Sequence, residues 1–317
     1  MKDLSVILVS YNTAELSKKV LDLLFTSNLQ RERYEVFVID NASQDDSNQI
    51  LEFEFPNITL IKNSVNVGFG RANNQVLNNI SGRYVLLLNT DAFVERDTLD
   101  KTLQFMDNNP DTGILGVRLV GRDGILQPSC RYFPTAWNLF VQRAGLQRWF
   151  KLTKMVDDMH WDHASVRQCD WVPGCYYLVR KEVIDQVGLF DPRFFLYYEE
   201  VDHCLAAKKA GWQVTYFPDA TVVHIGGESA KTDNKISSVS KQVSFLQIES
   251  EILFFRKNNN FSGFLIYVFL FILADLFAFS KTSIKSIVYG RKCKHLFAIP
   301  LFIHILIKTS FGIKPIH

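Results

Sequence analysis

The chain has few of the features that build cross-linked or zinc-stabilised folds. Its 317 residues include five cysteines, an odd number, and no two of them stand in a CxxC spacing. This pattern argues against a disulfide framework and against a structural zinc site, so we expect reduced thiols. Lys2, Asp3 and a strand-like run follow Met1 without a longer basic segment, which predicts that no signal peptide opens the chain.

A basic run is also missing from most of the chain. From Arg256 onward there are nine Lys and Arg and a single acid, which gives this tail a net charge of +8 and leaves −6 for residues 1–255. The acidic body argues against general nucleic-acid binding, whereas the basic, aromatic-rich tail predicts an anionic membrane surface as its partner. Hydrophobic residues make up 47% and charged residues 21% of the chain, so a packed core is expected and wholesale disorder is excluded.

Strand-like and helix-like segments alternate four times within the first 100 residues. Short apolar runs rich in β-branched residues are typical of strands that are buried on both faces. Such runs occupy residues 4–9, 35–39, 58–62 and 84–88, with helical patterns between them. The alternation predicts an α/β fold with a mostly parallel sheet, right-handed crossovers and flanking helices.

Polar residues directly follow three of these strand-like runs. They are Ser10-Tyr11-Asn12, Asp40-Asn41 and Asn89-Thr90-Asp91. Loops favour such residues in any case. Ligands of parallel α/β sheets, however, bind beyond the carboxyl ends of the strands, and three polar ends in register favour a ligand site there over ordinary turns.

The second half of the chain is less regular. Further strands are expected at 114–119, 171–179, 213–217 and 221–224, a hairpin turn at 121–124, and helices at 181–187 and 199–210. The stretch 131–165 holds Trp137, Trp149 and Trp161 but has no clear period. A lid, an acceptor-side insertion and a helical packing element remain open alternatives for it.

The C-terminal tail combines an expected amphipathic helix at 238–256 with two apolar stretches, 263–280 and 296–307. Five basic residues lie between the apolar stretches: Lys281, Lys285, Arg291, Lys292 and Lys294. This pattern favours a helix pair lying in the cytoplasmic interface of an anionic membrane. One short span with one interfacial helix is the first alternative, and helices that cap the body or form a dimer seam are the second.

Several motifs occur in one order along the chain: VILVSYN at Val6–Asn12, VIDNAS at Val38–Ser43, NVGFGRAN at Asn66–Asn73, LLNTD at Leu87–Asp91, and the segment Phe195–Gly211. Together they resemble the family 2 glycosyltransferases, most of all the bacterial rhamnosyltransferase-like branch. The resemblance implies a GT-A fold, a Rossmann-like, mostly parallel sheet flanked by helices. It also implies a nucleotide-diphosphate sugar donor, a divalent metal ion and inversion at the anomeric carbon. We therefore expect a catalytic domain at 1–235 and a helical, membrane-associated extension at 236–317.

A metal site is expected from the chemistry as well as from the resemblance. Breaking a C–O bond to a diphosphate puts negative charge on the leaving group, and Mg²⁺ or Mn²⁺ can stabilise that charge. Asp91 is the natural ligand, although Asn89 stands where the family usually has the first acid of Asp-x-Asp. His224, followed by Ile225-Gly226-Gly227, matches the position of a ligating histidine in the family; a purely structural role is the alternative.

The resemblance places the donor at the strand ends. Asp40 would accept hydrogen bonds from the base or ribose, with Asn41 supporting its loop and Ser10 and Tyr11 lining the base. Glycines at 68 and 70 permit close approach of the backbone to the diphosphate side of the donor. Arg71 offers either a cationic fork to the donor or a surface ion pair. The implied donor-binding set is Ser10, Tyr11, Asn12, Asp40, Asn41, Asn66, Gly68, Arg71, Asn89, Thr90 and Asp91.

Inverting transfer needs a base that removes the proton of the acceptor hydroxyl. The resemblance assigns this role to Glu200, the second acid of Glu199-Glu200-Val201-Asp202. Glu199 is the alternative base, and Glu199 and Asp202 would otherwise orient the acceptor or the loop. Acids at a helix start also simply complement its dipole. Trp171, Gly174 and Tyr198 are candidates for the acceptor side, with core packing as the alternative for the aromatic rings.

These expectations combine into one function. The chain is predicted to be an inverting hexosyltransferase at the cytoplasmic face of the cell membrane, peripheral or with one short span. It would move a sugar, rhamnose as the first guess, from a dTDP or UDP donor to a polyprenyl-diphosphate-linked or polysaccharide acceptor. A membrane-tethered sugar-nucleotide binder with a degenerate site and a nucleotidyltransferase are the alternatives. A glycoside hydrolase is disfavoured because it needs two carboxylates flanking the bond.

Overall fold

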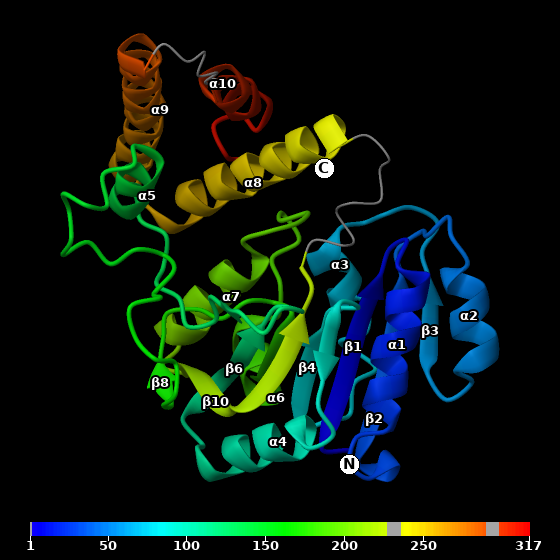
Figure 1. The fold of residues 1–317 in the computed structure, drawn as a ribbon. Helices are drawn as coiled ribbons and strands as arrows, with labels where there is room; N and C mark the ends of the chain where they lie inside the picture. The colour runs from blue at the N-terminus through cyan, green and yellow to red at the C-terminus, as the bar shows by residue number, and fades with distance from the viewer. Residues whose placement is uncertain (1, 227–235, 290–297) are drawn as a thin grey trace.

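The computed structural model describes residues 2–226, 236–289 and 298–317. Within these residues ten strands form one mixed sheet in the order β3-β2-β1-β4-β9-β6-β10-β5, with β7 paired to β6 and β8 to β10 (Figure 1). The strands are β1 Leu4–Ser10, β2 Tyr34–Asp40, β3 Thr59–Lys62, β4 Tyr84–Leu88, β5 Ala92–Val94, β6 Thr112–Val120, β7 Leu126–Gln127, β8 Arg167–Gln168, β9 Tyr176–Arg180 and β10 Gln213–His224.

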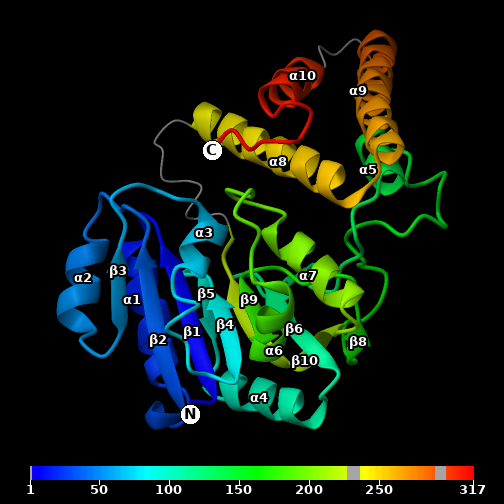
Figure 2. The same cartoon turned by 180° about the vertical axis from the view of Figure 1, so that it is seen from behind.

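Helices cover both faces of this sheet, as Figure 2 shows from behind. On one face α1, α2 and α4 pack on side chains such as Val6 and Leu86, and on the other face α3, α6 and α7 pack on Ile7 and Leu87. Successive strand residues point to opposite faces, so a sheet covered on both sides requires the continuous apolar strands that the sequence contains. The helices are α1 Ala14–Phe25, α2 Ser47–Glu54, α3 Phe69–Asn74, α4 Thr98–Asn108, α5 Ala136–Arg143, α6 Lys181–Val187, α7 Glu199–Lys209, α8 Ile236–Asn258, α9 Phe261–Tyr289 and α10 Ile299–Lys308, with a 3-10 turn at Arg31–Arg33.

The first part of the sheet agrees with the prediction. β3, β2, β1 and β4 run parallel to one another. β9 lies antiparallel between β4 and β6, and β5 lies antiparallel to β10. The predicted fold class, a mostly parallel sheet flanked by helices, is therefore confirmed, with antiparallel strands added in its second half.

Three elements differ from their predicted bounds. The strand expected at 171–179 starts only at Tyr176, because Trp171 instead forms an isolated bridge with Arg131 and a Pro-Gly turn follows it. The helical pattern expected between the runs 58–62 and 84–88 forms only the short α3, 69–74. The two short strands expected after residue 213 form the single strand β10, with an irregular register between Phe217 and Thr221.

The C-terminal helices lie against one end of the body. α8 passes over α7, α9 packs along α5, and α10 packs on α8 (Figures 1 and 2). The prediction of a simple amphipathic helix near 238–256 is wrong for α8, because all residues from Glu249 to Phe255 are buried. They are enclosed because α8 lies between the body that contains the sheet and the helices α9 and α10. Arg291, Lys292 and Lys294 of the predicted basic connection, and Leu296 at the start of the second apolar stretch, lie outside the described residues.

Candidate active site

The order of the strands brings the predicted polar ends to one edge of the sheet. β2, β1 and β4 are neighbours, and Ser10 is in register with Asp40. The loop Asn89-Thr90-Asp91 leaves the end of β4, and Thr90 and Asp91 are buried. Neighbouring strands lie about 4.8 Å apart, so the ends of β2 and β4 are separated by roughly 10 Å.

Asp40 is fully buried at this edge. Its Oδ2 accepts hydrogen bonds from the Ser43 amide (3.0 Å) and from Asn48 Nδ2 (3.0 Å). Its Oδ1 is buried and has no hydrogen-bond partner among the described residues. Because a buried acceptor without a partner is costly, this oxygen is suited to accept a hydrogen bond from a ligand.

The other residues predicted near Asp40 fall into two groups. Ser10 is buried and its hydroxyl lies 2.9 Å from the Ser17 hydroxyl, so it faces the protein interior. Asn12 connects two loops, because its amide donates to Ser43 and its Oδ1 accepts from the Gln44 amide (2.7 Å). Tyr11 is partly exposed beside them.

Asn41 and Asn66 organise the loop that precedes α3. Asn41 Nδ2 donates to Asn66 Oδ1 (2.7 Å), and Asn41 Oδ1 accepts from the Val67 amide (3.1 Å). Asn66 Oδ1 also accepts from the Gly68 amide (2.9 Å). These contacts make both asparagines supports of the loop.

Gly68 has a φ of +89° and lies against the segment before α7. A Cβ at Gly68 would come within 2.5 Å of the Phe195 carbonyl oxygen, to which the Phe69 amide donates. The backbone of Gly68 thus lies close to that of Phe195, whereas its predicted approach to the donor diphosphate stays a prediction. Arg71 forms no ion pair with an acidic side chain of the described residues, and its guanidinium donates instead to the main-chain oxygens of Pro192 and His317 (2.7 Å each).

Asp91 and His224 meet where β4 and β10 end. His224 Nε2 lies 3.6 Å from Asp91 Oδ1, and the Ile225 amide donates to the Asp91 carbonyl. Gln127 determines the tautomer of this histidine. Its Nε2 donates to the His224 carbonyl (2.8 Å), so its Oε1 faces His224 Nδ1 (2.9 Å) and accepts the proton there.

This arrangement fits a divalent cation. Burial lowers the pKa of His224, against the opposing influence of the Asp91 charge, so the ring is neutral near pH 7. With the proton on Nδ1, the lone pair of Nε2 faces a carboxylate oxygen, and a cation between them would satisfy both. No cluster of three or more His, Cys, Asp or Glu suited to a metal occurs among the described residues, so a bound cation would need further ligands from the donor or from water.

Glu199 and Glu200 begin α7, directly after Tyr197 and Tyr198, whose φ angles are +71° and +69°. Burial raises the pKa of Glu200, while the charge of Arg131 and nearby backbone amides, including that of Gly174, lower it. Burial raises the pKa of Glu199 well above its ordinary value, and the charge of Glu200 adds to the effect. Burial therefore raises the pKa of both neighbouring acids, and only Glu200 has a nearby cation, Arg131, that opposes the rise.

Cys175 connects the two halves of the site. Its carbonyl accepts from the Asn89 amide (3.0 Å), which joins it to the loop that carries Asp91. Burial raises the pKa of its thiol to about 12, and the charges of Asp91 and Glu200 contribute in that order. The charges of both carboxylates therefore act on one thiol, although the two residues are more than 100 positions apart in the sequence.

A cavity of about 1360 Å³ opens beside Glu200. Trp171 and Tyr198 line it, as do residues of α5, α8 and α9. Trp171 is buried, donates to the Tyr132 carbonyl (2.8 Å) and carries the Arg131 guanidinium over its ring. Gly174 leaves open space, because a Cβ there would find Phe69 no closer than 3.9 Å. Glu199 does not line this cavity.

Comparisons with known proteins decide the family. Residues 5–161 match the family model described as "Glycosyl transferase family 2". The N-acetylglucosaminyl-diphospho-decaprenol L-rhamnosyltransferase of Mycobacterium tuberculosis (strain H37Rv) is 30% identical over 250 residues, which cover 73% of this chain and 78% of that relative. The chain belongs to glycosyl transferase family 2. This membership confirms the resemblance read from the motifs and makes the protein a glycosyltransferase rather than a nucleotidyltransferase.

Further relatives of this glycosyltransferase support the same branch and fold. Rhamnosyltransferase WbbL of Escherichia coli K12 is 26% identical over 69% of this chain and 82% of that relative. The mannosyltransferase PcManGT from Pyrobaculum calidifontis, solved with GDP-Man and Mn²⁺, has a TM-score of 0.58 and 16% identity over 97% of this chain and 80% of that one. TarS of Staphylococcus aureus, solved with UDP-GlcNAc, has a TM-score of 0.53 and 18% identity over 96% and 80%. The GT-A fold is thereby confirmed.

Sequence reasoning missed the residues of α8 that contact the segment carrying Glu199 and Glu200. Asp202, predicted to orient the acceptor or the loop, pairs with Lys257 (2.6 Å) and accepts from Asn258 (2.9 Å). Glu251 accepts from the Tyr198 hydroxyl (3.0 Å) and from Arg143 (2.6 Å). Gln127 was missed as well. No local motif marks these residues, because their partners lie tens of residues away; buried acids in a helix of an apolar tail were the one available signal.

Proposed function

We propose that this glycosyltransferase moves a sugar, rhamnose as the first candidate, from a dTDP or UDP donor to a lipid-linked or cell-surface polysaccharide acceptor, with inversion of configuration. The M. tuberculosis relative is named for rhamnosyl transfer to a decaprenol-linked substrate, and WbbL is named a rhamnosyltransferase. The observation that carries the proposal is that Asp91 lies beside His224 and Glu200 on the wall of a large cavity, while the Cys175 carbonyl holds the amide of Asn89 in the loop that carries Asp91.

The donor would lie along the strand-end edge. Its base or ribose would donate to the unpartnered Oδ1 of Asp40, and its diphosphate would reach the loop that carries Asp91. Asp91, His224 and the diphosphate would hold Mg²⁺ or Mn²⁺, which supplies positive charge to stabilise the departing diphosphate. Asn89 in place of an acid leaves more of the metal shell to the diphosphate. Arg71 stays a predicted donor contact, but its bonds to the Pro192 and His317 carbonyls favour a tethering role instead.

The acceptor would enter the cavity beside Glu200. Its hydroxyl oxygen attacks the anomeric carbon, the bond from that carbon to the diphosphate oxygen breaks, and the hydroxyl proton passes to the Glu200 carboxylate. Attack from the side opposite the diphosphate inverts the anomeric centre. Glu200 is favoured over Glu199 because it lines the cavity and Glu199 does not, while each of the two side chains has a buried Oε2 without a hydrogen-bond partner among the described residues.

A membrane location is proposed from α9. The segment Phe261–Val288 is long and apolar enough to cross a membrane, and only 28% of its most apolar window is buried inside the protein. Large side chains such as Phe269 (63% exposed) and Ile287 (82% exposed) face outward. A helix that served only as a soluble core element would bury them. We therefore propose that α9 contacts the cytoplasmic face of the membrane, by spanning it or by lying on it.

A sugar-nucleotide binder without transferase activity is the second candidate. It is favoured by Asn89 at the position of the usual acid and by the small number of metal ligands that the described residues bring together. The two candidates share donor binding and differ in turnover.

Thermal shift with a panel of nucleotide sugars and Mn²⁺, followed by a transfer assay, tests the proposal. A donor that binds only the folded state raises the melting temperature. At 100 times its Kd it adds about 2.7 kcal/mol to the free energy of unfolding. We expect a dTDP or UDP sugar to do so in the wild type, and Asp91→Ala to lose the Mn²⁺-dependent part of the shift. Metal-dependent turnover that survives Asp91→Ala would refute the metal role, and binding without any transfer would favour the second candidate.

A further inference from the structure

Two large apolar side chains are displayed on a loop of the catalytic body that the proposed chemistry does not use. Trp149 is 82% exposed and Leu152 is 101% exposed. Trp137 on α5 and Phe150 beside them are 43% and 39% exposed. Scattered exposed apolar residues are ordinary, but a contiguous group that includes tryptophan marks an interaction surface.

Basic residues alternate with these apolar ones. Arg148, Lys151 and Lys154 occur within the ten residues 146–155, and no acid lies between residues 144 and 156. The body as a whole is acidic, so this local charge of +3 stands out. Tryptophan and leucine interleaved with Lys and Arg are typical of segments that lie at the interface of an anionic bilayer.

The loop is fixed beside the candidate membrane helix. Leu146 and Met155, at its two ends, pack in one cluster with Leu270 and Leu273 of α9. Lys281 of α9 donates to the Gly145 carbonyl (3.1 Å). In Figures 1 and 2 the loop after α5 projects from the body at the side of α9.

Contacts within the loop hold its aromatic rings. Trp137 meets Phe150 edge to face at 5.1 Å, and its indole N–H donates to the Thr153 hydroxyl (3.2 Å). The exposed rings of Trp149 and its neighbours therefore belong to an ordered surface. Continuity with α9 ties that surface to the face of the molecule where the membrane is expected.

We propose that residues 146–155 are a membrane-contacting loop. Trp149, Phe150 and Leu152 enter the headgroup region of an anionic bilayer, and the basic side chains bind lipid phosphates. The inference depends on the proposed membrane contact of α9 and not on the sugar transferred. With α9 as one contact and the loop as a second, the rotation of the catalytic body about α9 is fixed relative to the membrane.

Stacking of an acceptor sugar on Trp149 is the competing explanation. A hollow of about 710 Å³ does lie along this loop. It shares no residue with the cavity that Glu200 lines, and the fully exposed Leu152 offers nothing to a sugar. The lipid surface is therefore the favoured partner.

The fluorescence of Trp149 reports directly on the surroundings of its own side chain. We would reconstitute the full-length wild type and Trp149→Phe in nanodiscs of phosphatidylglycerol with phosphatidylcholine, and take the difference of their emission as the Trp149 signal. We expect the Trp149 emission maximum to be blue-shifted relative to detergent-free protein without lipid. Lipids brominated in the acyl chain should quench this emission, and iodide should quench it little. Trp149 emission that shows no blue shift, is quenched by iodide and is unaffected by brominated lipid overturns the proposal.

Charge variants supply the matched control. Lys151→Gln/Lys154→Gln is expected to lose most of the lipid quenching of Trp149, as is the wild type in discs of phosphatidylcholine alone. Arg122→Gln/Lys209→Gln removes two exposed charges elsewhere on the body and should leave the quenching unchanged. Equal quenching in both double variants would contradict lipid-phosphate binding by the loop. Transfer to a water-soluble acceptor, assayed in parallel, separates failure of this proposal from failure of the transferase itself.

Discussion

Two neighbouring acids at the start of α7 have different surroundings, and this difference defines their roles. Glu200 lines a cavity and is influenced by Arg131, whereas Glu199 is enclosed next to it. A general base works best when its pKa lies near the working pH. Burial moves the pKa of Glu200 upward in that direction, and the Arg131 charge limits the rise.

The pH dependence of kcat/KM tests this balance. A base must be deprotonated, so activity falls as the pH drops through the pKa of Glu200, which lies above its ordinary value of 4.5. Arg131→Met removes a charge that lowers this pKa, so the acid limb should move to higher pH. Arg131→Lys keeps the charge and should move the limb less. An acid limb at the same pH in Arg131→Met as in the wild type would mean that Arg131 does not influence the base.

Gln127 acts on His224 by fixing which ring nitrogen carries the proton. Gln127→Leu keeps the size of the side chain but removes the acceptor of the Nδ1 proton. Loss of such a partner typically weakens metal affinity by about 10–100-fold. We expect the Mn²⁺ concentration for half-maximal activity to rise by that amount, with kcat at saturating Mn²⁺ much less affected. An unchanged Mn²⁺ requirement would mean that His224 is not a ligand.

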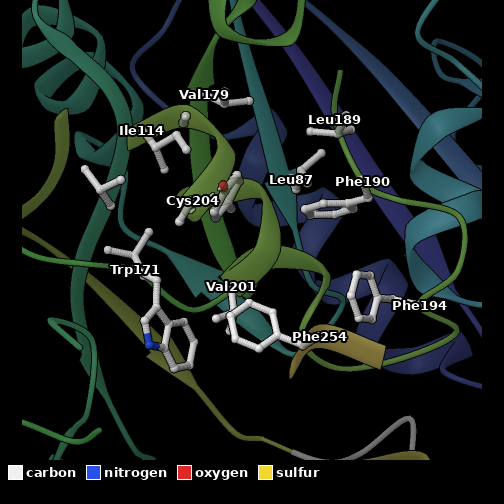
Figure 3. Close-up of a cluster of buried hydrophobic side chains, with 14 of the residues drawn as sticks. Leu87, Ile114, Trp171, Val179, Leu189, Phe190, Phe194, Val201, Cys204 and Phe254 are labelled. Atoms are coloured by element: carbon white, nitrogen blue, oxygen red, sulfur yellow. Dashed lines mark hydrogen bonds between the residues drawn. The ribbon is translucent and has the colours of Figure 1, made fainter. Parts of the chain in front are cut away.

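At the scale of elements, α8 holds the segment that carries the base. Ser250 donates to the Leu196 carbonyl (2.8 Å), and Lys257 pairs with Asp191 and Asp202 (2.6 Å each). In Figure 3, Phe254 of α8 lies beside Val201 and near Phe194. The left-handed turn at Tyr197 and Tyr198 is strained, and such turns persist where surrounding contacts hold them.

Removing the α8 ion pair should therefore disturb catalysis more than donor binding. Lys257→Met leaves the buried Asp202 carboxylate without its cation, so we expect a lower kcat, an unchanged Kd for the donor and a lower melting temperature. Lys181→Met breaks an exposed pair with Asp185 and should cost only about 0.3–0.5 kcal/mol. Equal effects of the two substitutions on kcat would remove the positioning role of α8.

The strand ends were predictable from the sequence because each effect is local. A buried parallel strand is a run of apolar residues; Asp40 follows such a run directly, and Asp91 ends the polar triplet that follows another. The antiparallel course of β9 and the roles of Gln127 and Glu251 were not predictable in this way. Gln127 meets His224 and Glu251 meets Tyr198 only after the chain has folded, and neither position carries a repeating pattern that would reveal its partner.

At the scale of the whole molecule, the acidic body and the basic tail are joined through polar contacts. The proposed division into 1–235 and 236–317 passes between β10 and α8, yet Glu251 and Lys257 bind residues of the body. The tail is thus a candidate for membrane contact and also part of the wall of the cavity beside Glu200. An acceptor held at the membrane surface would meet the base at the junction of the two parts.

The convergence of Asp40, Asp91 and Glu200 from three distant segments is tested most directly by single-turnover transfer in Glu200→Gln and Glu199→Gln, with donor Kd measured on the same preparations. We predict that Glu200→Gln keeps the wild-type donor Kd and loses about 10²–10⁴-fold in transfer rate, while Glu199→Gln retains most of the rate. Near-wild-type transfer by Glu200→Gln would contradict the assignment of the base and, with it, the proposed geometry of the reaction.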